Sequence, residues 1–299
     1  MIKEILEAKH LMQVCNINTW EADFKTLAMR FHPDKCKDPQ ASDVMSKLNS
    51  LRHDYLEGWT LSDDAGVYTS NGYTHCWKGE KTLREKSEIK RKDLVQNLGI
   101  RYKDEALEHF MKYICPEPVE LDTITKVETK NRYIPLSKVY TLLQNVEHKE
   151  KHIYWIYSRM IEFCATLSSL SVNHTGINID SVFVNPVDHS IRVMTFYHLM
   201  PMGKRLSTIS GRWSTFYPEH VFRKKESRPG IDVTLAKKTA IYLLGDSSGS
   251  GVLLRNNKDI NPHVLEHLLT PEEDGRDAMD NWRKVIKNNF KSEFLILNI

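Results

Sequence analysis

The sequence predicts a multidomain chain in which a small all-α domain precedes a larger α+β domain. Two segments whose apolar residues have helical spacing flank a short loop near residue 33. Closely spaced Gly and Ser residues then mark a break, and mixed helix and strand patterns follow from Tyr133. We therefore expect the small domain at residues 1–60, a linker at 61–80 and the larger domain at 81–299.

The composition is that of an ordinary globular protein. The 299 residues are 40% apolar and 27% charged, and the net charge is +3, which does not favour a nucleic-acid partner. No apolar run reaches the roughly 20 residues that span a bilayer, and the charged N-terminus does not resemble a signal peptide. The five cysteines form no C-x-x-C pair, so we expect neither disulfides nor a metal site, and we expect a cytoplasmic location.

The small domain has three predicted helices. The first covers residues 3–14, the second begins at Trp20 and ends near Phe31, and the third begins near Ala41. The second helix must end there because Pro33 disfavours helical backbone at the residue before it.

The loop between the second and third helices contains His32-Pro33-Asp34. Lys25 and Arg30 lie off the apolar face of the preceding helix, and Lys35 follows the tripeptide. This order of amphipathic helix, basic face, HPD and amphipathic helix resembles the J domain of DnaJ/Hsp40 co-chaperones. The alternative to a binding loop is that the tripeptide only ends the preceding helix, with Asp34 as a local cap.

The resemblance implies that the loop and the basic face contact a DnaK-type Hsp70 and stimulate its ATPase. Asp34 would make charge-assisted contacts, His32 would donate or accept a hydrogen bond, and Pro33 would restrict the backbone. Lys25, Arg30 and Lys35 would steer the encounter with an acidic face. No Gly/Phe-rich linker and no zinc region follow, so a client would bind elsewhere on the chain.

The larger domain contains several predicted elements. A long helix covers residues 149–171, two short strands lie in SVFVNP and HSIRVMTFYH, and further helices cover 231–245 and 276–290. The charged stretch at 78–92 is either a basic patch or, as we expect, a solvated helix face or exposed strands, because Glu is interleaved throughout it.

The run that follows the long helix resembles a protein kinase catalytic loop, H-R-D-x-K-x-x-N, followed by D-F-G. His174 matches the His, whereas Gly176, Ser181 and Thr195 stand at the positions of the catalytic Asp and of the metal-binding Asn and Asp. These residue types neither hold Mg²⁺ well nor accept the hydroxyl proton, so the resemblance implies a pseudokinase that is no enzyme. No cofactor is expected.

Three other residues extend the kinase resemblance. Glu219 resembles the Glu of A-P-E, Arg276 the Arg that pairs with it, and Asp232 the buried Asp that opens the large helix of the C-terminal lobe. The resemblance implies a reduced N-terminal lobe at 81–135 and a C-terminal lobe at 136–299. In the N-terminal lobe, Lys81 or Lys86 with Glu105 or Glu108 is a candidate for the Lys–Glu pair. The alternative is an unrelated α/β or α+β domain.

The sequence therefore supports an Hsp70 co-chaperone or adaptor whose kinase-like domain binds a client. Two alternatives stay open. One is a diverged kinase or phosphotransferase tethered to Hsp70, and the other is a bacteriophage decoy that titrates the Hsp70 of its host.

Overall fold

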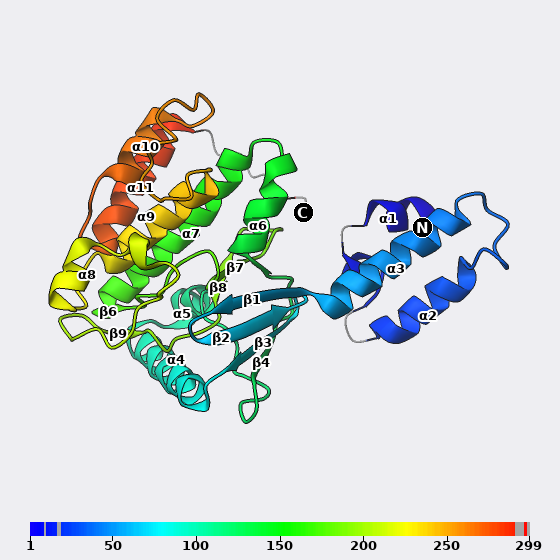
Figure 1. The fold of residues 1–299 in the computed structure, drawn as a ribbon, viewed down its shortest axis with the longest axis horizontal. Helices are drawn as coiled ribbons and strands as arrows, with labels where there is room; N and C mark the ends of the chain where they lie inside the picture. Colours follow the sequence, from blue (N-terminus) through cyan, green and yellow to red (C-terminus); the bar gives the residue numbers. More distant parts are fainter. Residues whose placement is uncertain (9, 17–18, 291–295, 298–299) are drawn as a thin grey trace.

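The computed structural model describes residues 1–8, 10–16, 19–290 and 296–297. Its first part, the N-terminal helical domain (residues 1–58), contains α1 (Ile2–Glu7), the 3₁₀ helix η1 (Leu11–Gln13), α2 (Trp20–Arg30) and α3 (Ala41–Glu57). Figure 1 shows α2 and α3 lying beside each other, with their connecting loop at the end of the domain remote from the rest of the chain. The predicted helices at residues 20–31 and from 41 are confirmed, whereas the one at 3–14 is split into α1 and η1.

A small apolar core holds these helices together. Ile5 of α1 packs with Val44 and Leu48 of α3, and the buried Phe31 at the end of α2 joins them. At the other end of α3, Leu51 packs with Leu11. Because α2 itself has no fully buried residue, its apolar face is covered only in part by α3.

Residues 61–80, which we expected to be a linker, are strands instead. The strands β1 (Trp59–Asp63), β2 (Gly66–Ser70) and β3 (Thr74–Gly79) form two antiparallel hairpins, and β4 (Thr125–Glu128) completes the sheet beside β3. The stretches SDDAG and TSNG, whose Gly and Ser residues suggested a linker, contain the hairpin turns. Gly72, for example, has φ +93°, and the Asn71 side chain accepts the N–H groups of Tyr73 and Thr74.

Two helices connect β3 to β4: α4 (Lys81–Arg101) and α5 (Asp104–Met111). The buried face of α4 is polar in the first half of the helix, where Arg84, Glu88 and Arg91 are all buried. Arg84 donates to the carbonyls of Leu121 and Asp122 at 2.6 and 2.7 Å. The prediction that this charged stretch is a solvated face is therefore wrong for these side chains.

The region from 59 to 133 is called the sheet lobe below, and the region from 134 onward the helical lobe. The sheet that we assign to the sheet lobe begins at Trp59 rather than at residue 81, and the expected lobe boundary near 135 stays a prediction. The end of the expected C-terminal lobe, residues 291–295 and 298–299, lies outside the described residues.

The helical lobe is built around the buried helix α7 (Lys149–Ser169), which the sequence predicted. Figure 1 shows α9 (Ile231–Leu243) and α11 (Gly275–Asn289) beside it. The helices α7 and α11 approach each other closely at Gly275, where a Cβ atom would lie 2.6 Å from the backbone carbonyl of Cys164. The other helices of the lobe are α6 (Leu136–Leu142), η2 (Leu143–Asn145), η3 (Ser214–Phe216), α8 (Glu219–Lys224) and α10 (Pro262–Leu269).

Two small sheets complete this lobe. The strands β5 (Ile134–Pro135), β7 (Val182–Val184) and β8 (Ile191–Val193) form one, and β6 (Val172–Asn173) with β9 (Met200–Pro201) forms the other. The predicted strand pair around Pro186 is thus confirmed as β7 and β8. Within the described ranges, no helix is long and apolar enough to cross a bilayer.

Candidate functional site

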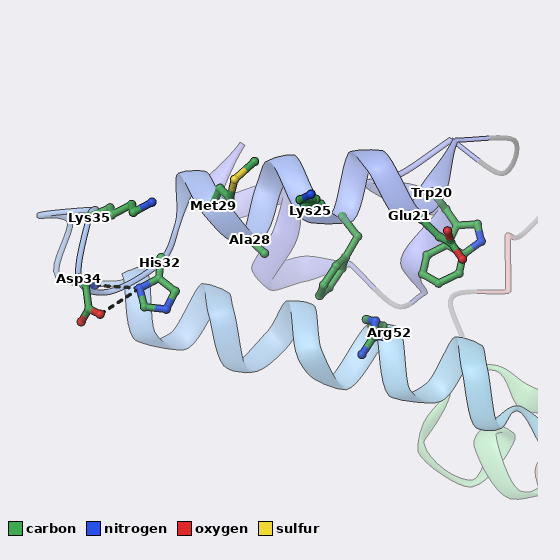
Figure 2. A pocket seen from close by; sticks show the side chains of 10 residues that line it. Trp20, Glu21, Lys25, Ala28, Met29, His32, Asp34, Lys35 and Arg52 are labelled. Carbon is green, nitrogen blue, oxygen red and sulfur yellow. Dashed lines mark hydrogen bonds and ion pairs between the residues drawn. The ribbon is translucent and has the colours of Figure 1, made fainter.

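A groove of about 670 Å³ lies between α2 and α3 in the N-terminal helical domain. Figure 2 shows that it runs along α2 and reaches the loop that follows this helix. Four of the six residues predicted to contact Hsp70 line it, and Pro33 and Arg30 do not. The lining residues are Trp20, Glu21, Phe24, Lys25, Ala28, Met29, His32, Asp34, Lys35 and Arg52.

The HPD loop is a tight turn. The N–H groups of Lys35 and Cys36 both donate to the His32 carbonyl at 2.9 Å. The His32 ring accepts the Asp34 N–H through Nδ1 at 3.2 Å, and the same ring nitrogen lies 3.5 Å from the Asp34 carboxylate. Both side chains stay accessible, because that of His32 is 49% exposed and that of Asp34 is 85% exposed. The loop therefore presents an imidazole and a carboxylate that few internal contacts occupy (Figure 2).

Cationic and aromatic side chains flank this turn. Lys25 and Lys35 line the groove. The Arg30 guanidinium lies over the Phe31 ring at 5.6 Å, and α3 supplies Arg52, whose guanidinium lies 5.4 Å from the Phe24 ring. Arg52 was not among the residues predicted to form this site, and its contact with Phe24 joins two different helices. The arrangement is suited to an acidic partner surface.

A second candidate site is the loop that precedes β7. His174 and Thr175 donate their N–H groups to the two carboxylate oxygens of Asp232, at 2.6 and 2.7 Å. Burial raises the pKa of Asp232 to about 6 and lowers that of His174 to about 4. The Nε2 atom of His174 bonds to the Thr195 carbonyl at 2.7 Å. The loop is thereby anchored to the first turn of α9 and to the segment after β8.

None of the three degenerate positions offers a carboxylate. The Ser181 hydroxyl donates to the Gly176 carbonyl at 2.7 Å, and Thr195 is buried beside Tyr68. At Gly176, a Cβ atom would lie 2.7 Å from Cδ2 of the His198 ring. Neither a metal-binding carboxylate nor a base for a hydroxyl proton is present at these positions.

The cleft between the sheet lobe and the helical lobe is filled by aromatic rings. The Trp77 ring stacks on Tyr68 at 5.6 Å and on Tyr197 at 5.4 Å, with interplanar angles of 3° and 27°. The space left beside Trp77 and Thr195 has a volume of about 10 Å³. Ligand pockets typically measure about 300–1,000 Å³, so a nucleotide does not fit here in this conformation.

The tip of the β1–β2 hairpin closes this cleft from outside. The Asp64 carboxylate accepts the Gly211 N–H at 2.5 Å. Arg212 donates to the Ser62 carbonyl at 3.2 Å and lies 3.4 Å from the Asp180 carboxylate. The two lobes are therefore connected across the filled cleft.

The expected pair between Glu219 and Arg276 does not form. Glu219 is exposed and pairs with Arg223, whereas Arg276 is exposed and pairs with Asp274, so the expected Glu219–Arg276 pair is wrong. Both residues lie at helix starts, where neighbours on the same helix or cap are the nearest partners.

A different pair is buried in this part of the lobe. The Lys237 ammonium lies 2.5 Å from Glu272, and it also donates to the carbonyls of His267 and Thr270. The sequence around Lys237 on α9 did not indicate that this side chain would form a buried ion pair.

Lys81 does not form the candidate Lys–Glu pair of the sheet lobe. Lys81 pairs with Glu85 and Asp122 at 3.9 and 3.8 Å, rather than with Glu105 or Glu108. The buried pair is Glu88–Arg91, both on α4.

Comparison with known proteins supports the fold of the larger region. No protein-family model matches the sequence, and no curated protein matches it. A Toxoplasma gondii rhoptry antigen kinase domain superposes with a TM-score of 0.52 at 14% identity, over 77% of this chain and 81% of its own. ROP2 from Toxoplasma gondii, described as a virulence factor with a protein-kinase fold and no enzymatic activity, superposes with a TM-score of 0.52 at 13% identity, over 80% of this chain and 89% of its own. The chain thus has an α+β protein-kinase-like fold.

Proposed function

We propose that this protein is an Hsp70 co-chaperone or adaptor, in which the N-terminal helical domain acts as a J domain. The observation that carries the proposal is the HPD turn, whose exposed His32 and Asp34 stand at the end of a groove that Lys25 and Lys35 also line. An acidic face of a DnaK-type Hsp70 would meet the lysines, and Asp34 would bond to a cationic side chain of that partner.

We further propose that the kinase-like region is a pseudokinase that binds a client. Three features support this: the positions 176, 181 and 195 carry no carboxylate, aromatic rings fill the cleft, and ROP2, which has a similar fold, is described as having no enzymatic activity. The J domain would then deliver the client to Hsp70.

The experiment for the first proposal is single-turnover ATP hydrolysis by a bacterial DnaK-type Hsp70. Wild-type protein accelerates hydrolysis, and Asp34→Asn loses the effect, because a charge-assisted hydrogen bond contributes about 1.5–3 kcal/mol, or roughly 10- to 100-fold in affinity. Asp54→Asn, which removes another exposed carboxylate of the same domain, is the matched control and keeps the stimulation.

Other outcomes separate the alternatives. Binding to Hsp70 through Asp34 without any acceleration favours a decoy that titrates the chaperone. Equal behaviour of Asp34→Asn and Asp54→Asn contradicts the J-domain proposal.

The pseudokinase proposal is tested by thermal unfolding with Mg-ATP. A ligand at 100 times its Kd stabilises the folded state by about 2.7 kcal/mol, which would raise the unfolding temperature clearly. We expect no change. A reproducible rise would favour the diverged kinase instead.

A further inference from the structure

Two segments of the helical lobe that are about 20 residues apart lie side by side near α8. The Gly203 N–H donates to the Ser227 carbonyl, and the Ser227 N–H donates to the Lys204 carbonyl, each at 2.7 Å. Leu206 and Lys225 are joined in the same way, and Arg205 and Glu226 form an antiparallel bridge. This pairing fixes the relative positions of cationic side chains from both segments.

Positive charge is concentrated in this part of the chain. Residues 203–228 contain seven Lys and Arg residues and two Glu residues, a local charge of +5, whereas the whole chain carries +3. The remainder of the chain is therefore slightly acidic. We call the cationic side chains of the paired segments and of the last turn of α8 the basic patch: Lys204, Arg205, Arg223, Lys224, Lys225 and Arg228.

Most of these cations have no acidic partner. Arg223 pairs with Glu219 and Arg228 with Glu226. The other four side chains are exposed and have no carboxylate within ion-pair distance among the described residues; they are Lys204, Arg205, Lys224 and Lys225. Four uncompensated cations on a fixed backbone create a local positive potential that attracts anionic groups.

An exposed aromatic ring lies within the patch. Phe222 on α8 is 49% exposed, while its neighbour Val221 is buried and attaches the helix to the lobe. Aromatic residues and Arg are enriched at protein interfaces, where they serve as anchors. Figure 1 shows α8 at the end of the helical lobe remote from the N-terminal helical domain, so a ligand here would leave the HPD loop accessible.

We propose that the basic patch binds an acidic segment of a protein that also offers an apolar side chain to Phe222. This inference rests on the proposed adaptor function, for which it supplies the chemistry of the client. A protein segment fits better than a nucleic acid, because Glu219 and Glu226 stand among the cations and Phe222 is the single exposed aromatic side chain on α8, whereas strand binding uses successive stacking rings.

The test measures binding of a fluorescent peptide of Glu and Gly with one central Leu to the full chain by anisotropy. Lys204→Gln/Lys224→Gln removes one cation from the first paired segment and one from the end of α8, and we expect it to weaken binding about five- to tenfold. The control Arg255→Gln/Lys258→Gln removes two exposed cations elsewhere and leaves binding unchanged. Phe222→Ala weakens the Leu peptide but not an all-Glu/Gly peptide. Raising the salt concentration weakens binding of both peptides.

Two outcomes overturn the proposal. One is equal affinity of the patch variant and the control variant for the peptide. The other is tighter binding of a single-stranded oligothymidylate than of the peptide at equal salt concentration, provided that the patch variant no longer binds the oligothymidylate. That result would assign the patch to nucleic acid.

Hsp70 stimulation, measured on the same proteins without peptide, separates the two proposals. The patch variant keeps stimulation and loses peptide, whereas Asp34→Asn does the reverse. If the wild-type protein does not stimulate Hsp70 but binds the peptide, the Hsp70 proposal fails and the peptide-binding proposal remains.

Discussion

Replacing Trp77 by Ala removes the central ring of the interlobe stack. The side chain is 3% exposed, it lies between Tyr68 and Tyr197, and its Nε1 donates to the Ala65 carbonyl at 3.2 Å. Truncation of a buried Trp typically costs about 3–5 kcal/mol. Each lost ring pair accounts for about 0.5–1.5 kcal/mol of such a loss, and the buried Ala65 carbonyl is left without its donor. We therefore expect the free energy of unfolding to fall by about 4 kcal/mol.

The assay is urea denaturation followed by circular dichroism, with the free energy obtained by linear extrapolation. Trp77→Phe is the matched control, because it keeps an aromatic ring in the stack and loses the N–H donor, so a smaller loss of about 1–2 kcal/mol is expected. If Trp77→Ala costs no more than Trp77→Phe, the ring does not fill the cleft and the argument against nucleotide binding fails.

Two further predictions concern the second candidate site and the buried histidines. Gly176→Asp does not create a catalytic base and instead destabilises the fold by about 1–3 kcal/mol, because its Cβ atom would lie 2.7 Å from the His198 ring; restored phosphoryl transfer with unchanged stability would contradict this. Stability to urea falls as the pH drops from about 6.5 to 4, because burial lowers the pKa of six histidines to about 3 or 4, and the unfolded chain binds protons that the folded chain does not. The contribution of each neutral histidine to stability is fully present above pH 6.5 and is lost as the pH falls toward its pKa in the folded chain. Asp232, whose pKa is raised, offsets one proton, and equal urea midpoints at about pH 7 and pH 5 would refute this prediction. The six histidines are His10, His75, His174, His189, His198 and His267.

Local patterns determined much of the architecture. The apolar spacing and Pro33 gave α2 and its end, and the same reasoning gave α3, α7, α9 and α11 within a few residues. The HPD turn was also local, since its hydrogen bonds join residues 32–36. Asn71-Gly72, flanked by alternating residues, was a hairpin signal that was interpreted as a linker, so this error was one of interpretation rather than of missing information.

Other features required the tertiary structure. In the sequence, Arg84, Glu88 and Arg91 look like a solvated helix face. Their burial is tolerable because Arg84 donates to the carbonyls of residues 121 and 122 and because Glu88 and Arg91 pair with each other, and neither contact can be read from the local sequence pattern. The filling of the cleft depends on Trp77 and Tyr197, which are 120 residues apart in the chain. Hydrophobic periodicity and turn chemistry act over a few residues and are therefore visible in sequence. Ion-pair choice, ring stacking and the accessibility of a cleft depend on which distant side chains the packing brings into contact, and that information arises only when the lobes are assembled.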